Sequence, residues 1–123
     1  MNTWIVDLEK QVMQMFLEGD YPFRFELNKQ YHLSKIVKRE VTGVGFFTTF
    51  LLPTNTPIIE NGKSLHIEDV QAEIEGLKYG VGFVLFIKDG KLEMLEGFSY
   101  DEPWPSLERP VQFKVFRKLA KFQ

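Results

Sequence analysis

Residues 80–105 read GVGFVLFIKDGKLEMLEGFSYDEPWP and contain the strongest structural signal in the chain. Two apolar runs, residues 81–87 and 92–98, flank the dipeptide Asp89-Gly90. A two-residue type I′ turn requires positive φ at both central positions, and Asp-Gly between alternating hydrophobic residues meets that requirement. We therefore predict a tight β-hairpin at the centre of the fold.

The length of the turn determines which side chains face each other across this hairpin. A two-residue turn places Ile87 opposite Leu92 and Phe83 opposite Glu96, whereas a three-residue turn would bring charged residues into the apolar face. Glu96 is therefore predicted on the more apolar face. A carboxylate there needs a cation or hydrogen-bond donors, or its pKa rises. We interpret Glu96 either as a rim carboxylate bonded to backbone N–H groups or an arginine, or as a ligand-binding or acid/base group at a pocket.

The composition is that of an ordinary globular protein. The 123 residues suit a single domain, 1–123, with 44% hydrophobic and 26% charged residues. The absence of cysteine excludes disulfides, thiolate metal sites and a cysteine nucleophile. Neither a secretory signal pattern nor an apolar run of about 18 residues is present. We expect a cytoplasmic protein that does not bind membranes.

The periodicity of the other segments predicts one helix and several further strands. Residues 3–18 carry apolar side chains at helical spacing, which suits a helix packed on a sheet. Alternating apolar residues predict strands at 23–28, within 31–41, at 46–52, at 70–75 and from Pro110 onward. Together with the hairpin, these segments predict an α+β domain, in which an N-terminal amphipathic helix packs on a mostly antiparallel sheet of about six strands.

Acidic and aromatic residues concentrate in one part of the chain. Residues 60–102 contain ten Asp or Glu against four Lys or Arg, although the net charge of the whole chain is only −2. Glu73 and Glu75 lie on the polar face of a predicted strand, and Asp101 and Glu102 precede Trp104. Two prolines around Trp104 predict a rigid loop in which this ring either plugs the core or remains exposed as an anchor for a partner. The basic residues are too dispersed to indicate nucleic-acid binding.

The sequence contains no motif specific to a reaction. His32 and His66 each lack a second ligand at metal-binding spacing. The Gly-Val-Gly runs at 43–45 and 80–82 lack the full pattern of a phosphate-binding loop, and no serine lies in a nucleophile elbow. We therefore predict no metal and no cofactor, and we do not expect an enzyme.

The run DGKLEMLEGFSYDEP, residues 89–103, resembles a segment of small uncharacterised bacterial proteins. These proteins carry a DG-x-[IL]-x-x-LE-[GY] hairpin followed by an aromatic, acidic, proline-containing loop, and some of them resemble toxin-neutralising immunity proteins. The resemblance covers about an eighth of the chain and emphasises Leu95, Glu96, Tyr100 and Pro103. These proteins have no established activity, so the resemblance assigns none to this chain.

The leading functional hypothesis is a non-enzymatic binding domain, immunity-like, that masks a partner protein such as a toxin or another protein with a basic surface. Its binding residues are predicted to be Glu73, Glu75, Glu96, Tyr100, Asp101, Glu102 and Trp104. The alternative is a small-molecule-binding domain or modest enzyme with Glu96 at the mouth of a pocket. Either a monomer or a homodimer formed through an exposed strand edge is compatible with the sequence.

Overall fold

A computed structural model of the chain describes residues 3–118. The helices are α1 (Thr3–Leu17) and α2 (Arg24–Leu33), and a single 3-10 turn, η1 (Glu60–Gly62), interrupts the long loop that follows the second strand. The strands are β1 (Lys35–Val41), β2 (Gly45–Leu51), β3 (Leu65–Ile67), β4 (Val70–Ile74), β5 (Val81–Lys88), β6 (Lys91–Ser99) and β7 (Phe113–Arg117).

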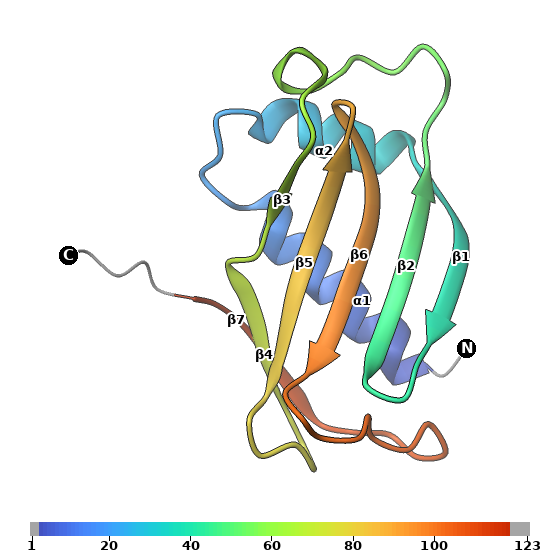
Figure 1. Cartoon of the computed structure of the whole chain (residues 1–123), viewed down its shortest axis with the longest axis vertical. Coiled ribbons are helices and arrows are strands. Elements are labelled where there is room, and N and C mark those ends of the chain that lie inside the picture. The colour runs from blue at the N-terminus through green and yellow to red at the C-terminus, as the bar shows by residue number, and fades with distance from the viewer. Residues whose placement is uncertain (1–2, 119–123) are drawn as a thin grey trace, which may run out of the picture.

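All seven strands form one sheet, and every strand pairing in it is antiparallel. The strand order is β1-β2-β6-β5-β4-β7, and the short strand β3 pairs with the upper part of β5. Both helices lie on the same side of the sheet, behind it in Figure 1, so within residues 3–118 no helix covers the opposite face. The predicted α+β class, with a helix packed on an antiparallel sheet, is confirmed.

Helix α1 forms where the sequence predicts it and provides one side of the core. Its buried side chains recur every three or four residues and include Ile5, Leu8, Val12 and Phe16. They pack against the inward-facing residues of the sheet in one continuous core. The opposite side of α1 is polar and exposed.

The strand predicted at residues 23–28 is wrong, because this segment is the start of α2. The alternation of Phe23, Phe25 and Leu27 is misleading, since Phe25 is 87% exposed while Leu27 is fully buried. The residues that α2 buries, Leu27 and Gln30, are three positions apart, which is helical spacing. A polar residue occupies one of these two positions, so the helical periodicity is hidden in the sequence.

The hairpin predicted around Asp89-Gly90 is present. Strands β5 and β6 pair from Lys88 opposite Lys91 at the turn to Val81 opposite Ser99. The φ angles of both turn residues are positive, 51° for Asp89 and 75° for Gly90. These are the backbone angles that a type I′ turn requires.

A β-bulge shifts the register shortly after this turn. Ile87 pairs with Leu92 as predicted, but Phe86 pairs with Met94, so Glu93 is the extra residue in β6. The two strands are offset by one position from there to the end of the hairpin.

The bulge overturns the predicted position of Glu96. Glu96 pairs with Val84 instead of Phe83 and lies on the face of the sheet opposite the core. Leu95 takes the inward position and is fully buried. A regular ladder would have placed the ionised carboxylate in the core at a cost of several kcal/mol. The bulge therefore exchanges a buried charge for a buried leucine.

A glycine pair allows strands β2 and β6 to approach closely. A Cβ atom on Gly45 would lie 1.9 Å from the backbone oxygen of Gly97, so no side chain fits there. The sequence predicts a bulge or a close backbone approach at residues 43–45, and the structure shows the close approach at Gly45.

One buried amide joins the tip of the hairpin to α2. The side chain of Gln30, only 1% exposed, donates from Nε2 to the carbonyl oxygens of Pro57 (2.8 Å) and Gly90 (2.9 Å). The backbone N–H of Leu92 donates to its Oε1 at 2.8 Å. All polar groups of this side chain are thus satisfied, and the turn is held against the helix.

A buried ion pair joins α1 to the first two strands. Arg39 of β1 donates two hydrogen bonds of 3.0 Å to the carboxylate of Glu9, which is 2% exposed. The hydroxyl of Thr48 on β2 also donates to this carboxylate. The hydrogen bond to Glu9 raises the pKa of Arg39. Since the guanidinium and the hydroxyl satisfy it, Glu9 stabilises the attachment of α1 to the sheet.

A second polar cluster joins the other end of α1 to β7. Asp69 accepts hydrogen bonds of 2.6 Å from the Tyr21 hydroxyl and from Arg117. Arg117 also donates to the backbone oxygen of Met15. Burial, followed by the hydrogen bond to Asp69, raises the pKa of Tyr21. These contacts hold β7, an edge strand of the sheet, beside the C-terminal end of α1.

Candidate functional site

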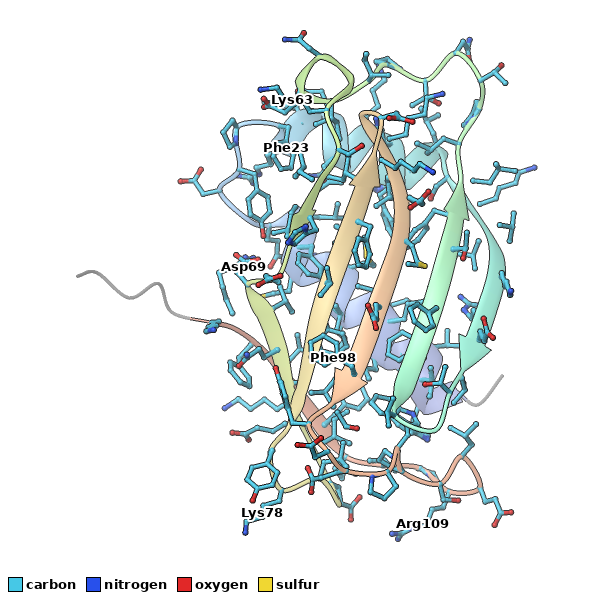
Figure 2. All side chains as sticks on the ribbon, viewed as in Figure 1. Phe23, Lys63, Asp69, Lys78, Phe98 and Arg109 are labelled. Carbon is cyan, nitrogen blue, oxygen red and sulfur yellow. The ribbon has the colours of Figure 1, made fainter. Side chains whose placement is uncertain are left out.

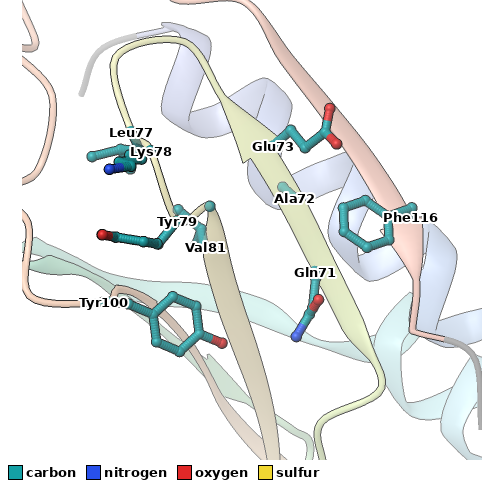
Figure 3. Close-up of a pocket in the computed structure, with 10 residues that line it drawn as sticks. Gln71, Ala72, Glu73, Leu77, Lys78, Tyr79, Val81, Tyr100 and Phe116 are labelled. Carbon is teal, nitrogen blue, oxygen red and sulfur yellow. The ribbon is translucent and has the colours of Figure 1, made fainter. Parts of the chain in front are cut away.

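Two of the predicted binding residues, Glu73 and Tyr100, line the same hollow at one end of the sheet. The hollow has a volume of about 420 Å3 and lies between strand β4, the turn before β5 and the loop after β6. Figure 3 shows Tyr100 and Phe116 on opposite sides of it, with Gln71 between them. We call this feature the aromatic hollow; its lining includes Gln71, Glu73, Tyr79, Tyr100 and Phe116.

The β4–β5 turn that borders the hollow is held in place by Glu102. The Glu102 carboxylate accepts the backbone N–H groups of Lys78 (2.9 Å) and Tyr79 (3.0 Å). Tyr79 is 61% exposed, and the ammonium group of Lys78 lies 5.4 Å from the centre of its ring. Glu102 therefore positions an exposed tyrosine in addition to contributing negative charge.

Tyr100 extends the aromatic surface from the hollow onto the sheet. Its ring lies 5.4 Å from that of Phe98, edge to face. A Cβ atom on Gly82 would lie 2.5 Å from the Tyr100 hydroxyl oxygen and 2.8 Å from the Phe98 ring. Gly82 thus leaves the space over β5 that both rings occupy, and Phe98 is visible over this part of the sheet in Figure 2.

Two further acids predicted to bind, Glu75 and Asp101, are exposed and lie within two residues in sequence of residues that line the hollow. Glu75 follows β4 and accepts the backbone N–H of Gln112 at 3.1 Å. Asp101 is at a turn position with a φ of 58°. Neither of them lines the aromatic hollow, so they contribute charge around it without forming its wall.

Trp104 is not available as an exposed anchor. It is only 9% exposed and stacks on Trp4 with 6.0 Å between ring centroids, while Phe46 lies 5.8 Å away. The backbone N–H of Trp104 donates to Gly43, which holds the loop against the β1–β2 turn. Of the two alternatives expected for Trp104, the structure shows the ring plugging the core.

Glu96 lies at the centre of the uncovered face of the sheet. Its neighbours on the adjacent strands are Phe47 and Val84, and Met94 and Phe98 lie two positions away along β6. It makes no hydrogen bond or ion pair with any residue in the described part of the chain. Burial raises the pKa of the Glu96 carboxyl group.

The polar partners predicted for Glu96 are not found, and its neighbours on the sheet are apolar. Neither an arginine nor a backbone N–H among the described residues bonds to it. Four hollows formed by the described residues have linings that do not include Glu96, so none of these four places Glu96 at a pocket mouth.

Three residues of this region were missed in the sequence. Tyr79 was absent from the predicted site because the turn at 76–80 contains no apolar periodicity. Phe47 and Phe116 were assigned no role, since their neighbours across the sheet depend on pairings between distant strands. The one local signal was the position of Tyr79 between Gly76 and Gly80, in the turn that borders the hollow.

No group of three or more metal-ligating side chains that could hold an ion is found in residues 3–118. Within the same range, the helices are too short or too polar to cross a bilayer. In comparisons with known proteins, the chain matches no family model, no curated protein and no solved structure.

Proposed function

We propose that this chain is a non-enzymatic binding domain, immunity-like in its role, that takes a basic partner protein at the aromatic hollow. The observation that carries the proposal is the convergence of Glu73, Tyr79 and Tyr100 from two separate parts of the chain on one hollow. Tyrosine combines a large apolar surface with a polar tip and is enriched where proteins bind one another. A hollow of about 420 Å3 suits one or two side chains of such a partner.

The charge around the hollow supports a basic partner. Glu73 and Lys78 line the hollow, and Lys114 lies opposite Glu73 on β7. Glu75, Asp101 and Glu102 are carried by the segments next to it, so acids outnumber bases around the hollow. Exposed charges within about 10 Å of one another act together at moderate ionic strength and accelerate association with an oppositely charged surface. A toxin that binds nucleic acid would present such a basic surface.

The test is capture of a partner by variants of the hollow. Wild-type protein and the double variant Glu73→Lys/Tyr100→Ala are immobilised and exposed to a native lysate of the source organism at low salt. Glu18→Lys is the matched control, because it makes the same change of charge at an exposed position just after α1. We expect one stoichiometric protein to be retained by the wild type and by the control, and its recovery to fall at least about tenfold with the double variant.

Two results would contradict the proposal. One is the recovery of no stoichiometric protein at low salt. The other is a partner that the double variant retains as well as the wild type does. A partner whose binding does not weaken as salt is added would contradict its electrostatic part.

A further inference from the structure

The uncovered face of the sheet carries an apolar surface with one acid at its centre. We define the open face as Phe47, Val84, Phe86, Met94, Glu96 and Phe98. We propose that the open face docks a segment of a partner protein that presents a lysine or arginine between apolar side chains, and that Glu96 binds this cation. The inference extends the proposed function, because it assigns a second contact surface to a basic partner.

Strand pairing places the apolar residues of the open face around Glu96. Phe47 and Val84 are its direct cross-strand neighbours, and such pairs have Cβ atoms about 5 Å apart. Met94 and Phe98 flank it along β6 on the same face, since side chains alternate along a strand. All four are partly exposed, so an incoming segment can bury them further.

Glu96 carries a charge that the fold itself does not use. An ion pair or donor would offset the loss of hydration, but the described part of the chain supplies neither. An apolar residue at this position would suit its surroundings better. The carboxylate therefore weakens the free protein slightly, and a cation that arrives from solution would offset this cost.

Two cations that the sheet carries elsewhere are already paired with acids close to them in sequence. Lys38 of β1 pairs with Glu40 at 3.5 Å, and His66 of β3 lies 3.5 Å from Glu68. Neither of them bonds to Glu96. The open face thus presents an unmatched negative charge surrounded by apolar surface, and its complement is a positive charge surrounded by apolar surface.

This charge pattern also selects among the candidates for the occupant. A second copy of the chain, packed face to face about a two-fold axis near Glu96, would bring two unpaired carboxylates together. A segment of a different protein avoids this repulsion. The contact between Phe98 and Tyr100 makes the open face continuous with the aromatic hollow, so one partner can cover both.

A short peptide tests the inference without knowledge of the natural partner. The probe is the capped peptide Ser-Val-Lys-Phe-Ser, and its control carries glutamine in place of lysine. Both are titrated into 15N-labelled protein, and the amide shifts of Phe47, Val84 and Glu96 are followed. A partly solvated ion pair gives a modest preference, so we expect the lysine peptide to bind about threefold to tenfold more tightly than the control.

Two variants identify the group responsible for this preference. Glu96→Gln keeps the shape of the side chain, removes its charge and should abolish the preference for lysine. Glu40→Gln is the matched control, because Glu40 lies beside Phe47 on the same face but is already paired with Lys38. With Glu40→Gln, the preference should remain.

The proposal is overturned if the peptide causes no shifts on the open face up to its solubility limit, if both peptides bind equally, or if the preference survives Glu96→Gln. A homodimer seen by light scattering that Glu96→Gln strengthens would show instead that a second copy covers the face. Failure here is separable from failure of the proposed function. In one outcome, the partner protein is lost with Glu73→Lys/Tyr100→Ala and is still captured by Glu96→Gln. That result would support the aromatic hollow as a binding site and refute the open face as one.

Discussion

Replacing Gln30 by leucine should destabilise the protein by about 2 to 3 kcal/mol, because it orphans a buried donor. The change removes three hydrogen bonds of 2.8 to 2.9 Å. The carbonyl oxygen of Gly90 keeps its hydrogen bond from the Ile59 N–H (2.8 Å). Pro57 is exposed, so its carbonyl oxygen can accept a hydrogen bond from water instead. The N–H of Leu92, which is 2% exposed, has no substitute. Its desolvation costs roughly 1–3 kcal/mol, and the two lost carbonyl bonds add a smaller amount.

The assay is urea unfolding monitored by circular dichroism, together with thermal unfolding. An unchanged m-value would show that the variant differs from the wild type in stability alone. For a chain of this size, the expected loss corresponds to a fall in Tm of about 6 to 15 °C. Gln30→Glu should lower the stability more than Gln30→Leu does, because it places a carboxylate against two carbonyl oxygens. Lys29→Ala, at an exposed position of the same helix, is the control and should change the stability by less than about 0.5 kcal/mol.

Hydrogen exchange locates the effect within the molecule. The N–H of Leu92 should lose protection in Gln30→Leu, because its acceptor is gone. The reasoning is refuted if Gln30→Leu is within about 0.5 kcal/mol of the wild type, or if Gln30→Glu unfolds at the same urea concentration as the wild type.

Two further predictions concern the charged groups on either face of the sheet. Replacing Glu9 by leucine should lower the free energy of unfolding by about 2 to 3 kcal/mol. The loss is smaller than for a fully buried ion pair, because the Arg39 side chain is 28% exposed. Adding Arg39→Met to this variant should recover most of the loss. Urea unfolding of the four proteins in this double-mutant cycle measures the coupling, and simple additivity would contradict it. Because the pKa of Glu96 is raised by folding, the folded protein keeps the Glu96 proton up to a higher pH than the unfolded chain does. The stability that this proton binding contributes is complete at low pH and is lost as pH rises through the pKa of the folded state. Unfolding free energies measured from about pH 4 to about pH 7 should therefore fall more steeply for the wild type than for Glu96→Gln, and equal slopes would show that this carboxylate is not desolvated.

The sequence by itself determined the elements whose signals are local. The Asp89-Gly90 turn depends on two adjacent residues that tolerate positive φ, and the structure has both in that region. Strand β4 alternates buried and polar side chains from Val70 to Ile74 as its sequence does. Helix α1 repeats its apolar residues over about four turns. Each of these patterns is complete within one segment of the chain, so no distant contact is needed to recognise it.

Only the tertiary structure decided where the segments between these signals lie. In α2 the residue that completes the buried face is Gln30, whose partners lie 27 to 62 positions away in the chain. The side of the sheet on which Glu96 lies depends on the bulge at Glu93, which allows Leu95 to enter the core. Local periodicity reflects the repeat of the backbone, whereas register and polar pairing depend on which distant strands meet. For that reason the hairpin was predictable from residues 81–98 alone, and the surface that its acid faces was not.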